Sequence, residues 1–386
     1  MPRRSILIFY PHNFYELSAG THRRMHALLG YFRSRNFSIH LLTLSGFSNV
    51  WDSRDAARTD LFDSLSVCDW RPRITHRFYR EWMLKAGRLN DLTTFTLRRT
   101  FKNLVEAVSF DYILIHYVFW ASLIDLARKE SVRVIDLHDF MTLSRFQHEE
   151  GQFRLGKMFQ DEIGAISKFD HALSISEEES VRLSPFCRST RFENVPYFCA
   201  ERFCKETHCD FDLLIIGSDN ELNRKGLQWF IREVAPRLPA GIRIAVSGKI
   251  SRFVEGKNSI VRLDYVEDLE ELYSRSLIAC CPVIGGTGLK IKVVEALSFG
   301  KPVVTTPWGL VGMLQKEENG CLSRNNGEEF AGAIQQLVND PGAYRKQQDL
   351  AKQFFKNQFS NAVVYRKLDQ LFLDNRRFPA AMCAGL

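Results

Sequence analysis

The chain carries GGTGLKIKVVEAL at residues 285–297 and, shortly after it, GKPVVTT at residues 300–306. The apolar run at 277–283 predicts a buried parallel strand before this stretch, and residues 289–299 predict a helix. A glycine-rich turn therefore leads into a helix N-terminus, where backbone N–H groups and the helix dipole favour a phosphate. Glu295, about two turns into the helix, could accept hydrogen bonds from sugar hydroxyls. Such turns are common in doubly wound α/β proteins, so the glycines alone do not identify a function.

Strand and helix patterns alternate along the chain, which predicts parallel sheets in an α/β protein. Strands are predicted at 5–10, 39–44, 112–116, 132–137, 172–175, 213–216, 242–247, 260–263, 277–283 and 303–305. Helices are predicted at 21–32, where Thr21 is the expected cap, and at 123–129, 159–167, 227–235, 269–274, 289–299, 328–338 and 344–373. Residues 192–210 break the pattern and are interpreted as a linker. We therefore predict a first domain at 1–200, a second at 201–345 and a C-terminal helix within 346–386.

Composition indicates a globular protein, with 45% hydrophobic and 25% charged residues. No apolar run reaches the roughly 18 to 20 residues that cross a bilayer. The apolar run at residues 6–10 is too short for a signal-peptide core, so it is interpreted as the first strand. Nine scattered cysteines fit reduced thiols, and Cys199, Cys204 and Cys209 lack the C-x-x-C spacing of a zinc site. These features predict a cytoplasmic protein.

The formal charge of +7 comes from one segment, residues 71–102. This segment contains two acidic residues, Glu81 and Asp91. It contains nine basic ones: Arg71, Arg73, Arg77, Arg80, Lys85, Arg88, Arg98, Arg99 and Lys102. Aromatic and apolar residues are interleaved with them, so the segment could contact an anionic membrane on its cytoplasmic face. A solvated helical face explains the pattern equally well. Nucleic-acid binding is a weaker alternative, because no nucleic-acid module accompanies the charge.

The full string, with Glu295 and the following Gly-Lys-Pro-Val-Val, resembles the donor-site signature of retaining GT-B glycosyltransferases, family 4 or glycosyl transferases group 1. The resemblance is closest to a Gly-Thr-Gly-Leu-Lys-x-Lys subgroup. It implies two Rossmann-like domains facing a central cleft, with a last helix that crosses back to the first domain. It also implies that a nucleotide-sugar diphosphate binds at Gly286, Thr287, Gly288 and Leu289, while Glu295 binds the ribose. Many members carry a first glutamate where this chain has Thr287.

A second part of the resemblance lies at residues 213–230, where a strand is followed by a polar turn and a helix. The family places basic side chains there to grip the leaving diphosphate, which makes Lys225 the first candidate, with Arg224 and Lys290 behind it. Ser218 stands where many members have arginine. In the first half, Gly20 precedes the first helix and would let the backbone approach the donor phosphates; a simple helix start explains it nearly as well.

Two histidines end predicted strands, His116 and His138, and strand C-termini are where ligands bind in this architecture. The motif at 136–139, with Arg145 downstream, resembles a family motif whose histidine points at the donor sugar. His138 is therefore a catalytic candidate together with Lys225 and Glu295. His116, Asp139 and Arg145 are candidates on the acceptor side, although a structural histidine remains an alternative for His116 and His138.

The resemblance implies a hexosyltransferase-type enzyme that transfers sugar with retention from a nucleotide sugar to a glycan, lipid-linked or small-molecule acceptor. Surface polysaccharide or glycoconjugate assembly is the expected setting. No Asp-x-Asp metal motif occurs in a convincing loop, so no metal and no cofactor are expected. Nucleic acid is not expected as a partner either. Two alternatives stay open: a non-catalytic GT-B nucleotide-binding partner of a glycan assembly complex, and a nucleotide-sugar epimerase.

Overall fold

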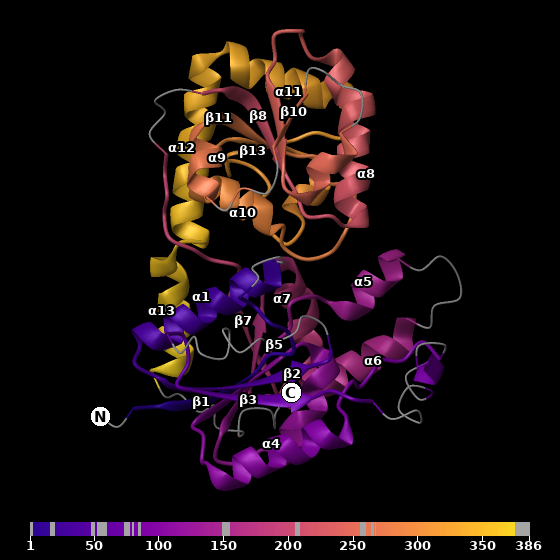
Figure 1. Cartoon of the computed structure of the whole chain (residues 1–386), viewed down its shortest axis with the longest axis vertical. Helices are drawn as coiled ribbons and strands as arrows, with labels where there is room; N and C mark the ends of the chain where they lie inside the picture. Colours follow the sequence, from indigo (N-terminus) through magenta and orange to yellow (C-terminus); the bar gives the residue numbers. More distant parts are fainter. Residues whose placement is uncertain are drawn as a thin grey trace. The chain divides into compact units, whose positions relative to one another are not determined.

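The computed structural model describes residues 3–15, 20–47, 51, 60–72, 78, 81–83, 86–148, 155–204, 209–254, 260–263, 266 and 268–374. The chain divides into two compact units, Met1–Val195 with Lys367–Leu386, and Pro196–Arg366 (Figure 1). Parts of two sequence-based predictions lie outside the described residues. They are residues 16–19, before Gly20, and the basic residues Arg73, Arg77, Arg80 and Lys85.

The described part of the first unit contains a seven-stranded parallel sheet in the order β3-β2-β1-β4-β5-β6-β7. Its strands are β1 (Ser5–Phe9), β2 (Ser38–Ser45), β3 (Ser64–Asp69), β4 (Tyr112–His116), β5 (Val132–Asp136), β6 (His171–Ser174) and β7 (Arg191–Asn194). The order in which successive strands are added to the sheet reverses between β1 and β4. In open α/β sheets this switch point opens a crevice at the strand C-termini, and β4 ends there at His116.

The helices of the first unit connect these strands. They are α1 (Gly20–Ser34), α4 (Phe95–Ala107), the 3-10 helix η1 (Val118–Leu126), α5 (Met141–His148), α6 (Leu155–Ile166), α7 (Glu177–Leu183) and the short η2 (Ser184–Phe186). Because α1 already begins at Gly20, Thr21 lies in its first turn, and the predicted threonine cap is wrong. The cap of α4 is Thr94, whose side chain accepts a hydrogen bond from the Leu97 N–H.

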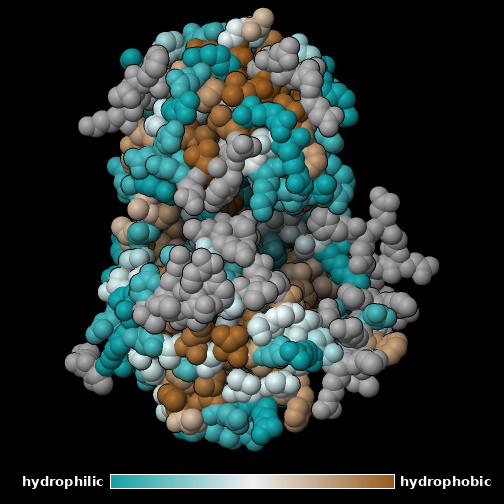
Figure 2. Space-filling model, viewed as in Figure 1, coloured by the Kyte–Doolittle hydropathy of each residue, from teal (hydrophilic) through white to brown (hydrophobic). Residues whose placement is uncertain are grey.

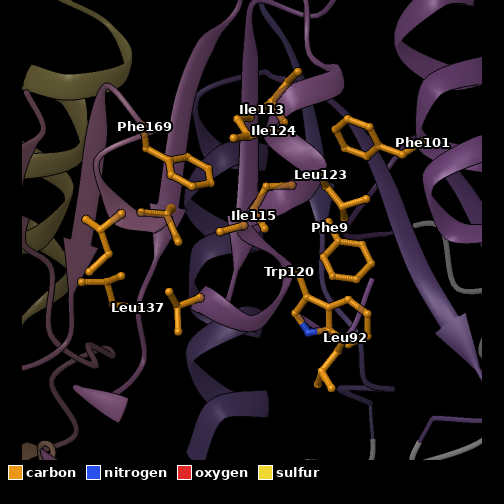
Figure 3. Close-up of a cluster of buried hydrophobic side chains, with 14 of the residues drawn as sticks. Phe9, Leu92, Phe101, Ile113, Ile115, Trp120, Leu123, Ile124, Leu137 and Phe169 are labelled. Atoms are coloured by element: carbon orange, nitrogen blue, oxygen red, sulfur yellow. The ribbon is translucent and has the colours of Figure 1, made fainter. Parts of the chain in front are cut away.

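The core of the first unit lies where η1 and α4 cover the sheet. Trp120 packs against Phe9 with ring centroids 5.2 Å apart, and Leu92 lies beside it (Figure 3). Phe101 from α4 and Phe169 fill the flanks of the same cluster (Figure 3). Burying an aromatic or aliphatic side chain of this size stabilises the fold by about 1.5–3 kcal/mol. This cluster therefore stabilises the positions of β1 and β4, the two strands that flank the switch point.

The second unit contains, within its described residues, a six-stranded parallel sheet in the order β10-β9-β8-β11-β12-β13. Its strands are β8 (Phe211–Ile216), β9 (Ile244–Ser247), β10 (Ile260–Leu263), β11 (Ser276–Cys281), β12 (Val303–Thr305) and β13 (Cys321–Ser323). The order again reverses, here between β8 and β11. Both units are therefore Rossmann-like, as predicted.

Helices surround this second sheet (Figure 1). They are α8 (Glu221–Trp229), which continues as the π-helix η3 (Phe230–Val234) and the 3-10 turn η4 (Ala235–Arg237), then η5 (Lys249–Phe253), α9 (Leu269–Ser274), α10 (Ile291–Ser298), η6 (Pro307–Leu310), α11 (Gly327–Asn339) and α12 (Pro341–Gln358). Side-chain caps begin several of them: Asn220 for α8, Asn326 for α11 and Asp340 for α12. Each cap satisfies N–H groups that the first turn leaves without an intrahelical partner.

The C-terminal region is two helices, and the prediction of one helix over 344–373 is wrong. Helix α12 ends at Gln358 and α13 spans Asn361–Phe372, and at the break Ser360 forms an isolated β-bridge with Cys199. From Lys367 onward the chain belongs to the first unit. There Phe372 is fully buried and packs edge-on against Phe32, with centroids 4.9 Å apart.

On the face drawn in Figure 2, hydrophilic residues cover much of the outer helices, and hydrophobic residues reach the surface in patches between them. Among the described residues, no helix combines the length and the apolarity that a bilayer-spanning segment needs.

Candidate functional site

The glycine-rich turn of the second unit lies between β11 and α10. Gly286 has φ of 98° and Gly288 has φ of 70°, a region in which residues with a Cβ are strained. Gly312, with φ of 96°, lies so close that a Cβ there would come within 2.9 Å of the Leu289 nitrogen. Glycines therefore allow this turn to form and a neighbouring loop to pack against it.

Three N–H groups of this turn make no hydrogen bond within the part of the chain that the structure describes. Among the described residues, those of Thr287, Gly288 and Leu289 donate no hydrogen bond, and Lys290, at the cap position of α10, makes no side-chain cap bond. The positive end of the α10 dipole lies directly behind them. This combination of free backbone donors and helix dipole favours an anion such as phosphate.

Glu295 lies in the second turn of α10 and its side chain is buried, with 5% of the residue exposed. A carboxylate at so little exposure requires hydrogen-bonding partners. The backbone carbonyl of Glu295 also accepts a hydrogen bond from Ser298 Oγ at 2.6 Å. Glu295 thus lies buried on the helix that begins at the glycine-rich turn.

The other basic candidates of this unit lie on a helix, where the sequence predicted a polar turn. Lys225 and Arg224 are inside α8, which begins at Glu221 because Asn220 caps it. The Lys225 ammonium pairs with Glu221 at 2.6 Å, and the Arg224 guanidinium lies 3.4 Å from Asp219. Lys225 forms no hydrogen bond to the glycine-rich turn within the described residues.

A hydrogen-bonded chain connects α8 to the start of α10. Lys292 Nζ donates to Asn223 Oδ1 at 2.6 Å, and Asn223 Nδ2 donates to the carbonyl oxygen of Ser218 at 3.0 Å. Asn223 Nδ2 also reaches Ser218 Oγ at 3.2 Å. Ser218 thus accepts the last hydrogen bonds of this series, through its carbonyl oxygen and its Oγ. Lys292 was not among the predicted site residues, although its place one turn after the glycines was visible in the sequence.

Gly226 gives a packing reason for the Lys-Gly pair in α8. A Cβ on Gly226 would lie 2.0 Å from the carbonyl oxygen of Pro282, directly after β11. Only glycine allows α8 to approach the chain so closely at that point.

In the first unit, side chains from three elements form a buried charged cluster at the C-terminal ends of β4 and β5. Arg24 of α1 donates hydrogen bonds to both carboxylate oxygens of Asp136, from Nη2 to Oδ1 at 2.8 Å and from Nε to Oδ2 at 2.9 Å and Oδ1 at 3.3 Å. His116 Nδ1 lies 3.2 Å from Asp136 Oδ2 and 2.9 Å from His138 Nε2. Arg24 and Asp136 are completely buried, so the cluster is shielded from water.

Burial and the arginine set the charges in this cluster. Burial alone would raise the pKa of Asp136, but the Arg24 guanidinium and the two histidines hold it well below its usual range. Burial lowers the pKa of His138 to about 3, although Asp136 opposes this, so His138 is neutral at pH 7. Burial likewise lowers the pKa of His12 to about 4. The cluster therefore contains one ion pair and at least one neutral imidazole.

His116 Nδ1 and His138 Nε2, the inner nitrogens, share a hydrogen bond. This bond also determines which of the two outer nitrogens, His116 Nε2 and His138 Nδ1, carries a proton. One inner nitrogen donates and the other accepts, so for neutral imidazoles the proton on the outer nitrogen is fixed as well. If His138 Nε2 carries the inner proton, His138 Nδ1 is an acceptor and His116 Nε2 a donor; the other tautomer pair reverses both. These outer nitrogens are buried and have no hydrogen-bond partner among the described residues. Each therefore lacks, within the described residues, the partner that a buried polar nitrogen normally has.

The backbone and an aromatic ring fix the position of His138. Both His138 and Tyr117 adopt positive φ, 62° and 67°, which is costly for residues with a Cβ and is concentrated at functional sites. The Tyr117 ring stacks on the His138 ring with centroids 4.1 Å apart and planes 15° apart. Burial raises the pKa of Tyr117 to about 12, so the stacked phenol stays neutral.

The ligand atoms of His116, Asp136 and His138 all lie within 4.8 Å of one another, which is close enough for a metal ion. The other contacts of these atoms argue against a metal. Both carboxylate oxygens accept hydrogen bonds from Arg24, and the inner imidazole nitrogens bond to each other. A metal would have to break these bonds and lie beside a guanidinium, so the donor set fits a hydrogen-bonded network better.

The remaining candidates of the first unit are Asp139, Arg145 and Gly20. Asp139 lies in the turn after β5, and its N–H donates to the carbonyl oxygen of Leu137 at 2.8 Å. Arg145 lies half-buried on α5, whose start is anchored by the buried Glu162. Gly20 is the first residue of α1.

Arg24 was missed by the sequence-based prediction. Its signal was a cation at an apolar position of the first helix, one turn before Leu28, where a buried charge requires a partner.

Comparison with known proteins agrees with this geometry. Residues 210–340 match the family Glycosyl transferases group 1. An uncharacterized glycosyltransferase of Haemophilus influenzae is 29% identical over 107 residues, which are 27% of this chain and 30% of that protein. The chain thus matches less than a third of the length of that relative.

Solved structures resemble nearly the whole chain. Sucrose-phosphate synthase from Thermosynechococcus elongatus matches with a TM-score of 0.70 and 14% identity, over 96% of this chain and 98% of its own. HepE from Anabaena in complex with UDP-glucose matches with a TM-score of 0.66 and 13% identity, over 95% and 98%. At these identities the likeness shows the fold, two parallel-sheet Rossmann-like domains as in GT-B glycosyltransferases. The family match thus covers a segment of the second unit, and the structural neighbours show a GT-B-like fold over nearly the whole chain.

Proposed function

We propose that this protein is a retaining glycosyltransferase that moves a sugar, of hexose type, from a nucleoside diphosphate sugar to a hydroxyl acceptor. The observation that carries the proposal is the glycine-rich turn at the start of α10, where backbone N–H groups donate no hydrogen bond to any described residue. This turn lies inside the segment that matches the glycosyl transferases group 1 family. Among the structural neighbours, HepE was solved with UDP-glucose and a pneumococcal O-GlcNAc transferase, GtfA, with UDP and GlcNAc.

In this proposal the second unit binds the donor. The N–H groups of Thr287, Gly288 and Leu289 bind the diphosphate, and Glu295 binds the ribose hydroxyls. Stabilising the departing diphosphate is the main catalytic contribution, because charge develops there in the transition state. The helix dipole and the backbone donors supply this stabilisation without a metal ion or a cofactor. Lys225 and Arg224 can contribute only by exchanging their carboxylate partners for phosphate oxygens.

The first unit binds the acceptor in this proposal, which is a glycan, a lipid-linked molecule or a small molecule. His138, neutral and held by the Tyr117 stack, offers its Nδ1 to a sugar hydroxyl. No protein nucleophile is required, since the acceptor oxygen attacks on the face from which the diphosphate departs. The enzyme then acts by orientation, which can contribute about 7–11 kcal/mol to a barrier when reacting groups are well placed.

Surface polysaccharide or glycoconjugate assembly, at the cytoplasmic face of a membrane, is the proposed setting. The support is the basic segment 71–102, in which Phe78, Trp82 and Phe95 are exposed by 67%, 58% and 70%. Some of its cations are already paired within the protein, such as Arg88 with Asp161 at 2.6 Å. Lipid headgroups would contact the remaining ones.

The test is incubation of the purified chain with a panel of nucleotide sugars and candidate acceptors, scoring nucleotide release and the sugar product. We expect release with one donor, and loss of donor binding in Glu295→Ala. The exposed Glu328→Ala in α11 is the matched control and should behave as the wild type. Failure to bind or cleave any donor, with no effect of Glu295→Ala, would contradict the proposal.

Two other results would point to different functions. Donor binding without turnover across all acceptors would indicate a non-catalytic partner in a glycan assembly complex. Conversion of the donor sugar without transfer would indicate an epimerase.

A further inference from the structure

The side chain of Lys290 folds back over the turn that precedes it. Its Nζ donates to the carbonyl oxygens of Gly286, Thr287 and Gly288 at 3.0, 2.8 and 3.0 Å. An ammonium group has three N–H donors. The turn therefore offers one acceptor for each of the three donors.

The orientation of three N–H groups follows from these bonds. No cis peptide bond occurs among the described residues, and in a trans peptide the C=O and N–H bonds point in opposite directions. Because three successive carbonyls face the ammonium, the N–H groups of Thr287, Gly288 and Leu289 face away from it. These are the same N–H groups that donate no hydrogen bond within the described residues.

We infer that Lys290 is a positioning residue, which orients the turn for a diphosphate and does not itself bind the phosphates. The inference rests on the proposed function. Three carbonyl dipoles pointing at one spot repel one another unless a cation lies between them. Without that cation the peptides would rotate toward water, and glycine at 286 and 288 offers little resistance to such a rotation. Lys290 thus stabilises the conformation of the turn in which the N–H groups of Thr287, Gly288 and Leu289 point away from the ammonium group.

A lysine-to-arginine exchange separates this role from direct phosphate binding. Arginine keeps the charge and grips phosphate well through its planar fork. A planar guanidinium cannot replace the compact ammonium among three converging carbonyls. If Lys290 contacted phosphate directly, Lys290→Arg would retain binding and Lys290→Met would lose it. If Lys290 positions the turn, both variants lose binding alike.

The binding experiment is titration calorimetry of the full chain with UDP, GDP, ADP and inorganic pyrophosphate. We expect Lys290→Arg and Lys290→Met each to weaken binding of the preferred nucleotide and of pyrophosphate at least tenfold. Lys346→Arg, an exposed lysine on α12, is the matched control and should leave binding unchanged. Wild-type affinity in Lys290→Arg contradicts the inference alone. A wild type that binds none of the four probes contradicts both the proposed function and the inference.

A second measurement needs no nucleotide. In NMR spectra of the wild type labelled with ¹⁵N-lysine, the Lys290 ammonium should exchange its protons with water more slowly than the exposed lysines do. Lys290→Met identifies the signal by its loss, and thermal unfolding of each variant shows whether the fold is kept. An ammonium signal that exchanges as fast as that of Lys346 would contradict the three bonds on which the inference depends.

Discussion

The glycine-rich turn of the second unit is built from backbone groups around one lysine, whereas the cluster of the first unit is built from side chains. In the turn, a lysine is surrounded by carbonyl oxygens from its own neighbours within four residues of chain. In the cluster, the arginine and the carboxylate that bind each other are separated by 112 positions. The first arrangement depends on local conformation and the second on the completed sheet, so different substitutions should disrupt them.

The largest expected effect comes from breaking the buried ion pair of the cluster. Arg24→Met leaves the Asp136 carboxylate buried without its main partner, which should destabilise the first unit by about 3–5 kcal/mol. Urea unfolding measures it. Removing both charges, as Arg24→Met with Asp136→Leu, should recover part of the loss. The control is Lys225→Met, since the exposed pair with Glu221 contributes at most about 1 kcal/mol. Equal losses in the buried and exposed pairs would contradict the contrast.

Gly286→Ala tests the turn, where the backbone is decisive. The added Cβ meets the flexible end of Leu222 at 3.0 Å and comes no nearer than 3.7 Å to Lys290, so most of the cost comes from holding alanine at φ of 98°, about 1–3 kcal/mol. We expect nucleotide binding to weaken about tenfold or more while the rest of the second unit stays folded.

Gly332→Ala is the matched control for that substitution. Gly332 lies in α11 with open space around its Cα, and alanine there should stabilise the helix by about 1 kcal/mol without affecting binding. Calorimetry for binding and urea unfolding for stability give the two readouts. If both glycine variants bind nucleotide equally, positive φ at 286 is not required.

The pH dependence should also differ between the two sites. The pKa of His138 is lowered to about 3 in the folded state, below its ordinary value near 6.5. Between these values the unfolded chain binds a proton that the native chain does not, so the stability contribution is full above about pH 6.5 and falls as pH decreases toward 3. One such group contributes a slope of about 1.4 kcal/mol per pH unit.

Hydrogen exchange of β4 and β5 peptides at pH 7, 6 and 5, corrected for intrinsic exchange, measures this slope in the first unit. His138→Asn, which tolerates positive φ, should flatten it. His12 contributes in the same direction and remains in the variant. An unchanged slope in His138→Asn would mean that His138 does not resist protonation in the folded state.

The smallest effect per residue is expected at the surface, in the segment 71–102. Each lysine or arginine near an anionic membrane contributes about 1 kcal/mol. Changing Arg77, Arg80, Arg98 and Arg99 together to Ser should therefore release the protein from acidic vesicles in co-sedimentation, as should 1 M salt, where the Debye length falls to about 3 Å. Binding that ignores both salt and lipid charge would leave the segment as a solvated face.

Sequence analysis predicted the turn well because its signals are local. The glycines, the apolar strand before them and the helix after them all lie within about two dozen residues, and each has its own conformational preference. What it did not predict there was the direction of Lys290, because a lysine near a helix start is normally solvated.

The cluster was only half predicted, since strand ends mark His116 and His138 but do not show that they touch. Arg24 lies on a different element, and its partner could be found only from the strand order. Strands β3, β7 and β13 were missed because each is short or lies at a sheet edge, where the apolar run is weak. Residues 221–225 were predicted as a turn because their polarity hid a helix that Asn220 caps.

The burial of Phe372 among Phe32, Phe37 and Tyr112 has a consequence for biosynthesis. A nascent chain leaves the ribosome from its N-terminus, and domains generally fold as they emerge. Here Phe32, Phe37 and Tyr112 of the first unit cannot make their contacts with Phe372 until helix α13 has been translated, after the second unit. The domain that is synthesised first is therefore completed last. Until then the aromatic side chains that pack against Phe372 lack this contact.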